Sequence, residues 1–209
     1  MCRRSPPTST WTWRRWRKRE RGRVIVLGVD PGTAVTGYGV VRGDGSGPSV
    51  LIECGVIRTR PRESLAARLA EIYDGIRELI ARHRPEAMAV EDVFYSRNVR
   101  TTLVLGHARG VILLAGQQAG LEIREYPPAE IKKAIVGNGA ATKEQVQFMV
   151  TRLLRLKTAP QPADASDGVA AALALIMRAQ YDHRVSTAML AAGGASPASP
   201  SKPVARGHA

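Results

Sequence analysis

One short segment limits most strongly what this chain can fold into. Residues 24–29 read Val-Ile-Val-Leu-Gly-Val, an almost unbroken run of β-branched and other apolar side chains. Such a run is typical of a strand that is buried on both faces of a sheet. The run ends at Asp30-Pro31-Gly32, which is a turn signal, so an acidic side chain stands where the buried strand stops. We therefore expect a sheet that is covered by helices.

The rest of the pattern extends this sheet. Further strands are expected at residues 37–42, 50–58, 87–90 and 121–126, and helices at residues 64–83, 99–119, 129–136, 142–156 and 164–180. The glycine-rich segment 43–48 is typical of a hairpin loop between the first two of these strands. Three strands followed by alternating helices and strands predict an α/β fold with a mixed antiparallel and parallel sheet.

The length of 209 residues favours one domain with a sizeable core. Hydrophobic residues make up 44% of the chain, which is close to the average of globular proteins. The folded domain is expected at residues 24–182. Residues 183–209 are rich in Ala, Gly, Ser and Pro and are expected to be a disordered tail. Residues 1–23 form a basic arm that is rich in Arg and Trp and has no core pattern of its own.

The positive charge is concentrated in that arm. Of the net charge of +13, residues 1–23 hold +8 and the remaining residues hold +5. Such an arm can bind nucleic acid or an acidic membrane surface. The alternatives are that it is disordered, or that translation starts at Val24 and the arm is not made. The body of the protein is only mildly basic, so charge alone does not establish a nucleic-acid partner.

Two classes of protein are excluded by composition. The chain has only two cysteines, Cys2 and Cys54, which cannot form a disulfide framework or a thiolate zinc site and which suit a reducing cytosol. No apolar run reaches the roughly 18 residues of a membrane span. We expect a cytoplasmic protein without a membrane partner.

Four acidic residues stand where a buried strand ends or a helix begins: Asp30, Glu91, Asp164 and Asp167. Ligands of open α/β sheets gather at the carboxyl ends of the strands. If the strands that end at Asp30 and Glu91 are parallel neighbours about 4.8 Å apart, their carboxylates lie side by side at the sheet edge. Asp164 and Asp167 share one face of the first turn of a helix, although capping of that helix explains either residue alone. Small residues around them would let this helix lie close against the sheet edge.

Four hard oxygen donors without clustered His or Cys suit Mg²⁺ or Mn²⁺ rather than zinc. Two such ions, about 3.5 to 4 Å apart, can activate a water and stabilise the leaving oxygen in phosphodiester hydrolysis. In this scheme Asp30 bridges the two ions and Glu91 holds one of them. Asp164 and Asp167 complete the ligand set and orient the attacking water.

An ordered set of motifs contains these acids. Its members are Asp30-Pro31-Gly32 with Thr36-Gly37-Tyr38-Gly39, Glu91-Asp92-Val93-Phe94 followed by Asn98, Val136-Gly137-Asn138-Gly139, Lys143 with Gln145-Val146, and Ala163-Asp164-Ala165-Ser166-Asp167-Gly168. Over residues 24–178, the chain resembles the RuvC Holliday junction resolvases of bacteria. Gly168 departs from the Ala that is usual in the family, which lowers helix propensity slightly.

The resemblance implies an RNase H-like mixed five-stranded sheet and a homodimer. Each subunit would use about two divalent ions to nick one of two like-polarity strands of a four-way DNA junction, in recombination and repair. The family's catalytic and metal-binding carboxylates correspond to Asp30, Glu91, Asp164 and Asp167. The family also suggests the RuvA and RuvB branch-migration proteins as partners.

Contacts with DNA follow in part from the same resemblance. It implies that the aromatic Phe94 contacts the junction and that Lys132 and Lys143 contact phosphates. A ring at Phe94 can stack on an unpaired base, whereas a core role is the alternative from the residue alone. The other candidates for DNA contact are Asn98, Arg97, Arg100 and Arg109, and for the arginines surface solubility is an equal explanation. Small residues in the helix at 99–119 make it a candidate dimer surface or a helix packed within its own core.

Three other functions are compatible with parts of this pattern. Asp30-Pro31-Gly32-Thr33 resembles the phosphate-binding hairpin of actin-like kinases and ATPases, but the second hairpin and domain of those proteins are missing from the sequence. A nuclease for precursor RNA, similar to the YqgF family, would keep the fold. A junction-binding protein without catalysis would not need four acids beside phosphates. The junction resolvase remains the main hypothesis.

Overall fold

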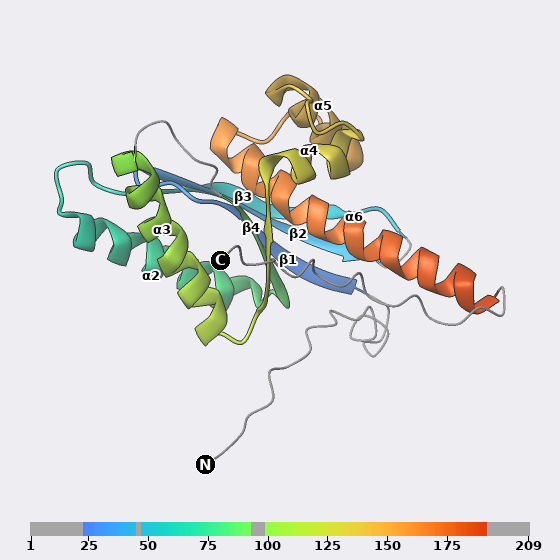
Figure 1. Ribbon diagram of the computed structural model, residues 1–209, viewed down its shortest axis with the longest axis horizontal. Coiled ribbons are helices and arrows are strands. Elements are labelled where there is room, and N and C mark those ends of the chain that lie inside the picture. The colour runs from blue at the N-terminus through green and yellow to red at the C-terminus, as the bar shows by residue number, and fades with distance from the viewer. Residues whose placement is uncertain (1–22, 45–46, 93–98, 192–209) are drawn as a thin grey trace, which may run out of the picture.

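The computed structural model describes residues 23–44, 47–92 and 99–191. The elements are β1 (Arg23–Asp30), β2 (Val35–Asp44), β3 (Val50–Arg58), α2 (Leu65–His83), β4 (Ala87–Glu91), α3 (Val99–Gln118), β5 (Glu122–Tyr126), α4 (Pro128–Val136), α5 (Lys143–Leu153) and α6 (Ala163–Ala191). In the described residues, strands β1 to β3 come first, helices and strands then alternate as far as β5, and helices α4 to α6 follow (Figure 1). The expected elements are present, with shifts of a few residues at most of their ends.

The strands form one five-stranded sheet in the order β3-β2-β1-β4-β5. β1 pairs antiparallel with β2 and parallel with β4, and β5 continues the parallel half. The mixed sheet predicted from the sequence is therefore confirmed. Because β1 lies in the middle, its apolar run is covered on both faces, as its composition requires.

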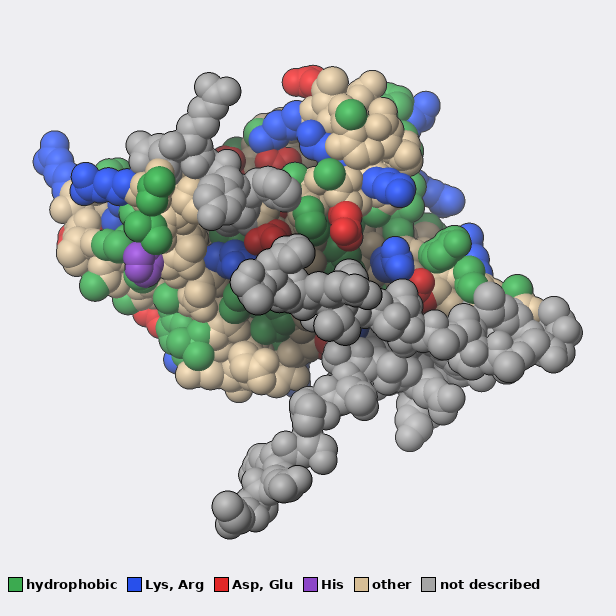
Figure 2. Space-filling view, viewed as in Figure 1, with side chains coloured by type: hydrophobic (Ala, Val, Ile, Leu, Met, Phe, Trp, Pro, Cys, Tyr) green, Lys and Arg blue, Asp and Glu red, His purple; other side chains and the backbone are tan. Residues whose placement is uncertain are grey.

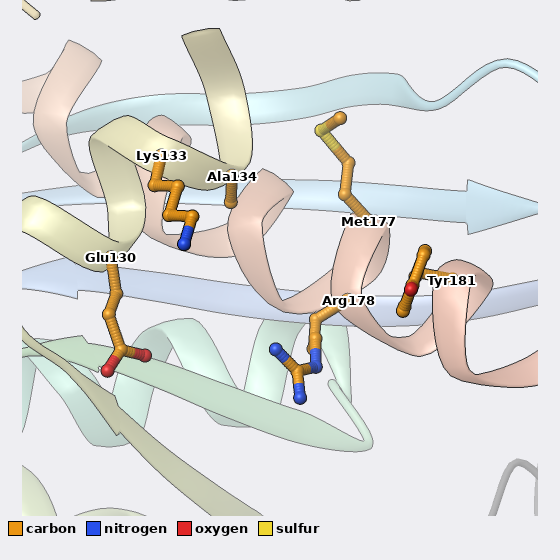
Figure 3. Close-up of a pocket in the computed structure, with 6 residues that line it drawn as sticks. All are labelled: Glu130, Lys133, Ala134, Met177, Arg178 and Tyr181. Atoms are coloured by element: carbon orange, nitrogen blue, oxygen red, sulfur yellow. The ribbon is translucent and has the colours of Figure 1, made fainter. Parts of the chain in front are cut away.

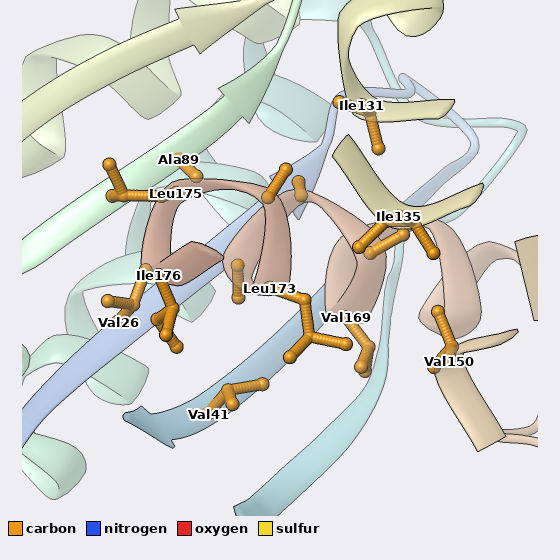
Figure 4. Packing of buried hydrophobic residues seen from close by; sticks show 14 of the residues in the cluster. Val26, Val41, Ala89, Ile131, Ile135, Val150, Val169, Leu173, Leu175 and Ile176 are labelled. Atoms are coloured by element: carbon orange, nitrogen blue, oxygen red, sulfur yellow. The ribbon is translucent and has the colours of Figure 1, made fainter. Parts of the chain in front are cut away.

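Helices cover the two faces unequally (Figure 1). Val26 of β1 packs in a cluster with α4, α5 and α6, whereas Leu27 and Val29 pack in a second cluster with α2 and α3. Figure 4 shows the first cluster, in which Leu173 and Ile176 of α6 approach Val26 and Val41 of the sheet. Alternate residues of β1 thus point to opposite helical layers, as expected for a strand.

Helix α6 begins close to the carboxyl end of β1, as its small residues predict, because a Cβ at Gly37, which pairs with Asp30, would lie 1.9 Å from the Asp164 carbonyl oxygen. From there the helix continues across the face of the sheet. Glycines permit the close approach: a Cβ at Gly28 would overlap the backbone of Gly168 and Ala172. A Cβ at Gly168 would lie 2.6 Å from the Cα of Tyr38 in β2. Gly168 is therefore better explained by helix-to-strand contact than by helix propensity, because backbone atoms leave no space for a methyl group.

The last helix is longer than expected. The sequence predicts that it ends near Gln180, but α6 continues to Ala191, past the boundary of the expected tail at residue 183. Few large apolar residues follow Gln180, so the periodic pattern stops before the helix does. None of the helices within the described ranges has an apolar stretch long enough to cross a membrane.

Candidate metal centre at the carboxyl ends of β1 and β4

The register between β1 and β4 brings two acids together. Val29 pairs with Val90 in parallel alignment, so the next residue of each strand, Asp30 or Glu91, lies at the same end of the sheet. Val29 and Val90 both face α2 and α3. Since side chains alternate along a strand, Asp30 and Glu91 point to the opposite face, where α6 lies.

The first turn of α6 adds the other two acids. Carboxylate oxygens of Asp30, Asp164 and Asp167 all lie within 4.8 Å of one another. Glu91 is outside this group of three, but it lines a cavity of about 230 Å³ together with Asp167, Lys132 and Lys143. The structure thus brings three of the four predicted acids into one cluster and places the fourth beside it.

The turn after β1 is held by side-chain hydrogen bonds. The Thr36 hydroxyl is fully buried and donates to the Gly32 carbonyl oxygen at 2.6 Å. The Thr59 hydroxyl donates to the Thr33 carbonyl oxygen, also at 2.6 Å. These two bonds join the turn that follows Asp30 to β2 and to the residue after β3. They therefore help to fix the position of Asp30.

The acids of the site are poorly solvated and close to one another. Burial, followed by the negative charges of Asp167 and Asp164, raises the pKa of Asp30 from 3.8 to about 7. Burial, followed by the charges of Asp30 and Asp167, raises the pKa of Glu91 from 4.5 to about 8. Both shifts have the same physical origin, because burial and like charges disfavour ionised carboxylates. A cation among these oxygens would remove the penalty.

One lysine already compensates part of this charge. The Lys143 Nζ lies 2.7 Å from Asp167 Oδ2, and this contact raises the pKa of the Lys143 ammonium. Lys143 is the first residue of α5, whose start is stabilised by reciprocal hydrogen bonds between Thr142 and Gln145. Lys132 reaches the same cavity from α4. Figure 2 shows acidic groups recessed beside Lys and Arg side chains on this face of the molecule.

The donor set fits a hard divalent cation. All candidate ligand atoms are carboxylate oxygens, which Mg²⁺ and Mn²⁺ prefer. Two of the acids have strongly raised pKa values without a cation, as expected of oxygens whose partner is a metal ion. Within the described residues, Asp30, Asp164 and Asp167 could hold one ion together.

The predicted DNA contacts have different outcomes. Phe94, Asn98 and Arg97 lie outside the described residues. Arg100 is exposed on α3 and lines a separate cavity with Thr33 at the turn after β1. Arg109 is engaged by acids of the protein itself, Asp92 and Glu125. Surface solubility and phosphate contact were the roles considered for Arg109 from the sequence. The structure instead places it between the ends of two strands, where it pairs with acids.

The long helix expected at residues 99–119 was a candidate for a dimer surface or for packing in the protein's own core. In the structure its two faces differ. Ala108, Ile112 and Ala115 are buried against the sheet. Val99 and Leu103 are 70% and 61% exposed, and Gly106 and Gly110 have open space in front of them. One face of the helix therefore packs in the protein's own core, and the other face is apolar and exposed.

A larger cavity of about 480 Å³ lies between α4 and α6. Figure 3 shows its lining residues: Glu130, Lys133, Ala134, Met177, Arg178 and Tyr181. A single carboxylate beside two cations offers no comparable set of metal ligands. We therefore assign the functional site to the smaller cavity at the strand ends.

Comparisons with known proteins agree with this assignment. The family model described as "Crossover junction endodeoxyribonuclease RuvC" matches residues 26–175. A curated crossover junction endodeoxyribonuclease RuvC from Halorhodospira halophila is 53% identical over 148 residues, covering 71% of this chain and 87% of that protein. Another from Pelotomaculum thermopropionicum is 48% identical over 150 residues, covering 72% and 91%.

A solved structure is similar over the same region. The Thermus thermophilus RuvC in complex with Holliday junction substrate superposes with a TM-score of 0.72 at 36% identity, covering 76% of this chain and 96% of that one. A second structure, described as "Thermus thermophilus RuvC structure", gives a TM-score of 0.71 at 37% identity. These matches confirm the α/β, RNase H-like fold predicted from the sequence and disfavour the kinase alternative.

Proposed function

Because the chain belongs to the RuvC family of crossover junction endodeoxyribonucleases, we propose that it resolves four-way DNA junctions in recombination and repair. It cuts phosphodiester bonds by hydrolysis, with paired symmetric nicks in strands of like polarity. The observation that carries this proposal is the cluster of Asp30, Asp164 and Asp167 within 4.8 Å of one another, with Glu91 on the neighbouring strand.

The four acids are the proposed metal ligands and catalytic residues. Asp30 and Glu91 approach from adjacent parallel strands, and Asp164 and Asp167 approach from one helical turn. Bound Mg²⁺, or Mn²⁺ in its place, at about two ions per subunit, would activate a water and stabilise the leaving oxygen. The parallel pairing of β1 and β4 keeps Asp30 and Glu91 close together despite the repulsion between their carboxylates.

Cationic side chains beside the acids would hold the DNA backbone. Lys143 and Lys132 line the cavity that contains Glu91 and Asp167. A scissile phosphate bound there would have ammonium groups on its outer side and carboxylates on its inner side. The further DNA contacts that we propose are Arg100, Phe94 and Asn98. Phosphate contacts of this kind set the position of the DNA and add salt dependence to its binding.

We also propose that the enzyme acts as a homodimer through the exposed face of α3. A dimer with two-fold symmetry would present two equivalent sites to two equivalent strands. The exposed Val99 and Leu103, with Gly106 and Gly110, form an apolar face on that helix. RuvA and RuvB are the proposed partners, by family resemblance, and the cytoplasm is the proposed location.

The first test uses a labelled synthetic four-way junction and a linear duplex of matching sequence. Wild-type protein should nick the junction symmetrically in Mg²⁺ and leave the duplex intact, and chelator should stop the reaction. Equal attack on the duplex or on RNA would reject junction specificity. Junction binding without nicks in either Mg²⁺ or Mn²⁺ would reject the enzyme and favour the binding-protein alternative.

Residues 24–182 are proposed to form the catalytic unit. Protein that lacks residues 1–23 should nick the junction at a rate within about twofold of the full chain, because all four acids lie in the remaining part. Circular dichroism serves as the control for folding. A large loss of nicking in folded, truncated protein would show that the basic arm takes part in DNA binding.

The raised pKa values predict how pH acts on the metal-free protein. Asp30 and Glu91 keep their protons up to about pH 7 and 8 in the folded state, whereas their ordinary values are 3.8 and 4.5. The folded state then binds more protons than the unfolded state between about pH 4 and 8, so stability falls as pH rises through this window.

Thermal melting in chelator and in Mg²⁺ checks this prediction. The melting temperature in chelator should decrease from pH 5.5 to pH 8.5. The increase caused by Mg²⁺ should be larger at pH 8.5, because only ionised acids bind the cation. A Mg²⁺ effect that is independent of pH would contradict the proposed state of these two acids.

A further inference from the structure

Arg109 connects two strand ends from the helix that covers them. Its Nη2 atom lies 3.2 Å from Asp92 Oδ1 and also contacts the Glu125 carboxylate. Its side chain is only 30% exposed, although it belongs to α3 near the surface. One guanidinium group therefore holds two carboxylates that come from different strands.

Of the two carboxylates, one is next to the proposed ligand Glu91 in the sequence and the other lies on the neighbouring strand β5. Asp92 follows Glu91, the last residue of β4, and its N–H donates to the Tyr126 carbonyl oxygen at 2.8 Å. Glu125 of β5 pairs with Val90 of β4. The ion pairs of Arg109 thus join residues on either side of the last pair of the ladder between β4 and β5, which is Glu91 with Tyr126.

Opposite faces of the sheet separate this ion pair from the metal ligands. Val90 packs toward α3, and Glu91 lies in the cavity on the α6 side with Asp167. Asp92 points back to α3, where it meets Arg109. The backbone next to Glu91 is therefore held by an ion pair on the α3 side of the sheet. The Glu91 carboxylate lies on the opposite side, in the cavity with Asp167 and the two lysines.

The charges show why this position needs a cation. Without Arg109, Asp92 and Glu125 would be two partly exposed acids on neighbouring strands that no longer share a cation, and the side-chain link between the ends of β4 and β5 would be lost. Glu91 lies at that end and is itself close enough to Asp30 and Asp167 for their charges to raise its pKa. A small displacement there would move Glu91 relative to the other acids.

We propose that Arg109 is a positioning residue for the metal centre: by holding Asp92 against Glu125, it keeps Glu91 in place for metal binding. This inference rests on the proposed function of the four acids as metal ligands. Residues behind metal ligands commonly change metal affinity by about tenfold or more when replaced. Arg109 itself contacts neither the metal ligands nor the proposed position of the DNA phosphate.

The chain offers a matched control on the same strand pair. Arg124 of β5 forms an ion pair with Glu122 at 3.1 Å. Its neighbour Ile123 packs toward α3, so Arg124 points to the other face of the sheet. Arg124→Gln therefore removes the same charge from β5 without touching the contacts of Asp92.

The test measures metal binding without DNA and then cleavage. Free Mn²⁺ is followed by its electron paramagnetic resonance signal in full-length wild type, Arg109→Gln, Arg109→Lys and Arg124→Gln. We expect Arg109→Gln to weaken Mn²⁺ binding about tenfold and Arg109→Lys to restore part of it, because the ammonium keeps the charge but not the planar geometry. Arg124→Gln should bind as wild type does.

Cleavage and DNA binding separate positioning from general damage. The Mg²⁺ concentration for half-maximal junction nicking should rise about tenfold in Arg109→Gln, whereas its junction affinity in chelator should stay within twofold of wild type. Combining Arg109→Gln with Asp92→Asn should weaken Mn²⁺ binding little beyond the single variant, since both changes break one contact.

Several results would overturn the proposal. Unchanged Mn²⁺ affinity in folded Arg109→Gln would do so, and so would an equal loss in Arg124→Gln. If Arg109→Gln does not fold, Asp92→Asn alone must show the weaker Mn²⁺ binding. Absence of nicking by wild type at every Mg²⁺ concentration would instead reject the proposed function, and the Mn²⁺ comparison would still decide the role of Arg109.

Discussion

Asp30→Asn is expected to abolish junction cleavage and, in chelator at pH 8, to raise the melting temperature of the protein. Asp30 belongs to the group of three acids, and its amide analogue cannot supply an anionic metal ligand. Loss of several kcal/mol of stabilisation in the transition state corresponds to a rate decrease of roughly a thousandfold or more. The melting temperature should rise because the variant removes a buried charge that Asp167 and Asp164 oppose.

Three measurements on one preparation check this expectation: nicking in Mg²⁺, junction affinity in chelator, and thermal melting in chelator. Junction affinity should remain within a few-fold of wild type, because Lys132 and Lys143 are unchanged. Asp74→Asn is the control, since Asp74 is exposed on α2 and lies outside the acid cluster. Nicking by Asp30→Asn at a rate near that of wild type would remove Asp30 from the catalytic residues.

Gly37→Ala is expected to lower stability and metal binding together. A Cβ at Gly37 would overlap the carbonyl oxygen of Asp164, so the start of α6 must move away from β2. Overpacking of this kind costs typically about 1–3 kcal/mol. Because Asp164 is a member of the acid cluster, its displacement should also weaken Mn²⁺ binding at least several-fold.

Gly43→Ala is the matched control on the same strand. Its Cβ would meet the Cγ2 atom of Ile176 at 2.8 Å, which is a side-chain methyl group rather than backbone. We expect a smaller loss of stability and unchanged Mn²⁺ binding, because Gly43 pairs with Val24 at the far end of β1 from Asp30. Urea denaturation and Mn²⁺ titration of both variants make the comparison. Equal Mn²⁺ affinity in the two variants would show that Gly37 has no role at the metal centre.

Local patterns predict the helices and strands, apart from the end of α6, and they place four acids at strand ends and at a helix start. The run at 24–29 predicts a buried strand because its side chains have no polar face to expose, and Asp30 follows from the turn signal after it. Asp164 and Asp167 were found from helical spacing after a proline-rich segment. These inferences hold because hydrophobic periodicity and turn chemistry are properties of neighbouring residues.

The partners of these residues could be predicted only in part. The sequence alone does not determine that β1 and β4 are parallel neighbours, and the structure pairs Val29 with Val90 in that way. Contact between α6 and the face of the sheet was not foreseen, although Gly28 and Gly168 are visible in the sequence. A glycine indicates that space is limited without indicating which segment occupies the remaining space.

The sequence by itself determined the α/β class, the buried central strand and the acidic residues available for a metal ion. Only the tertiary structure decided that Asp30, Asp164 and Asp167 form one group with Glu91 beside it, and that Arg109 joins Asp92 to Glu125. The reason is physical: periodicity records which face of an element is buried, whereas ion pairs and metal ligands depend on register and packing between segments far apart in the chain.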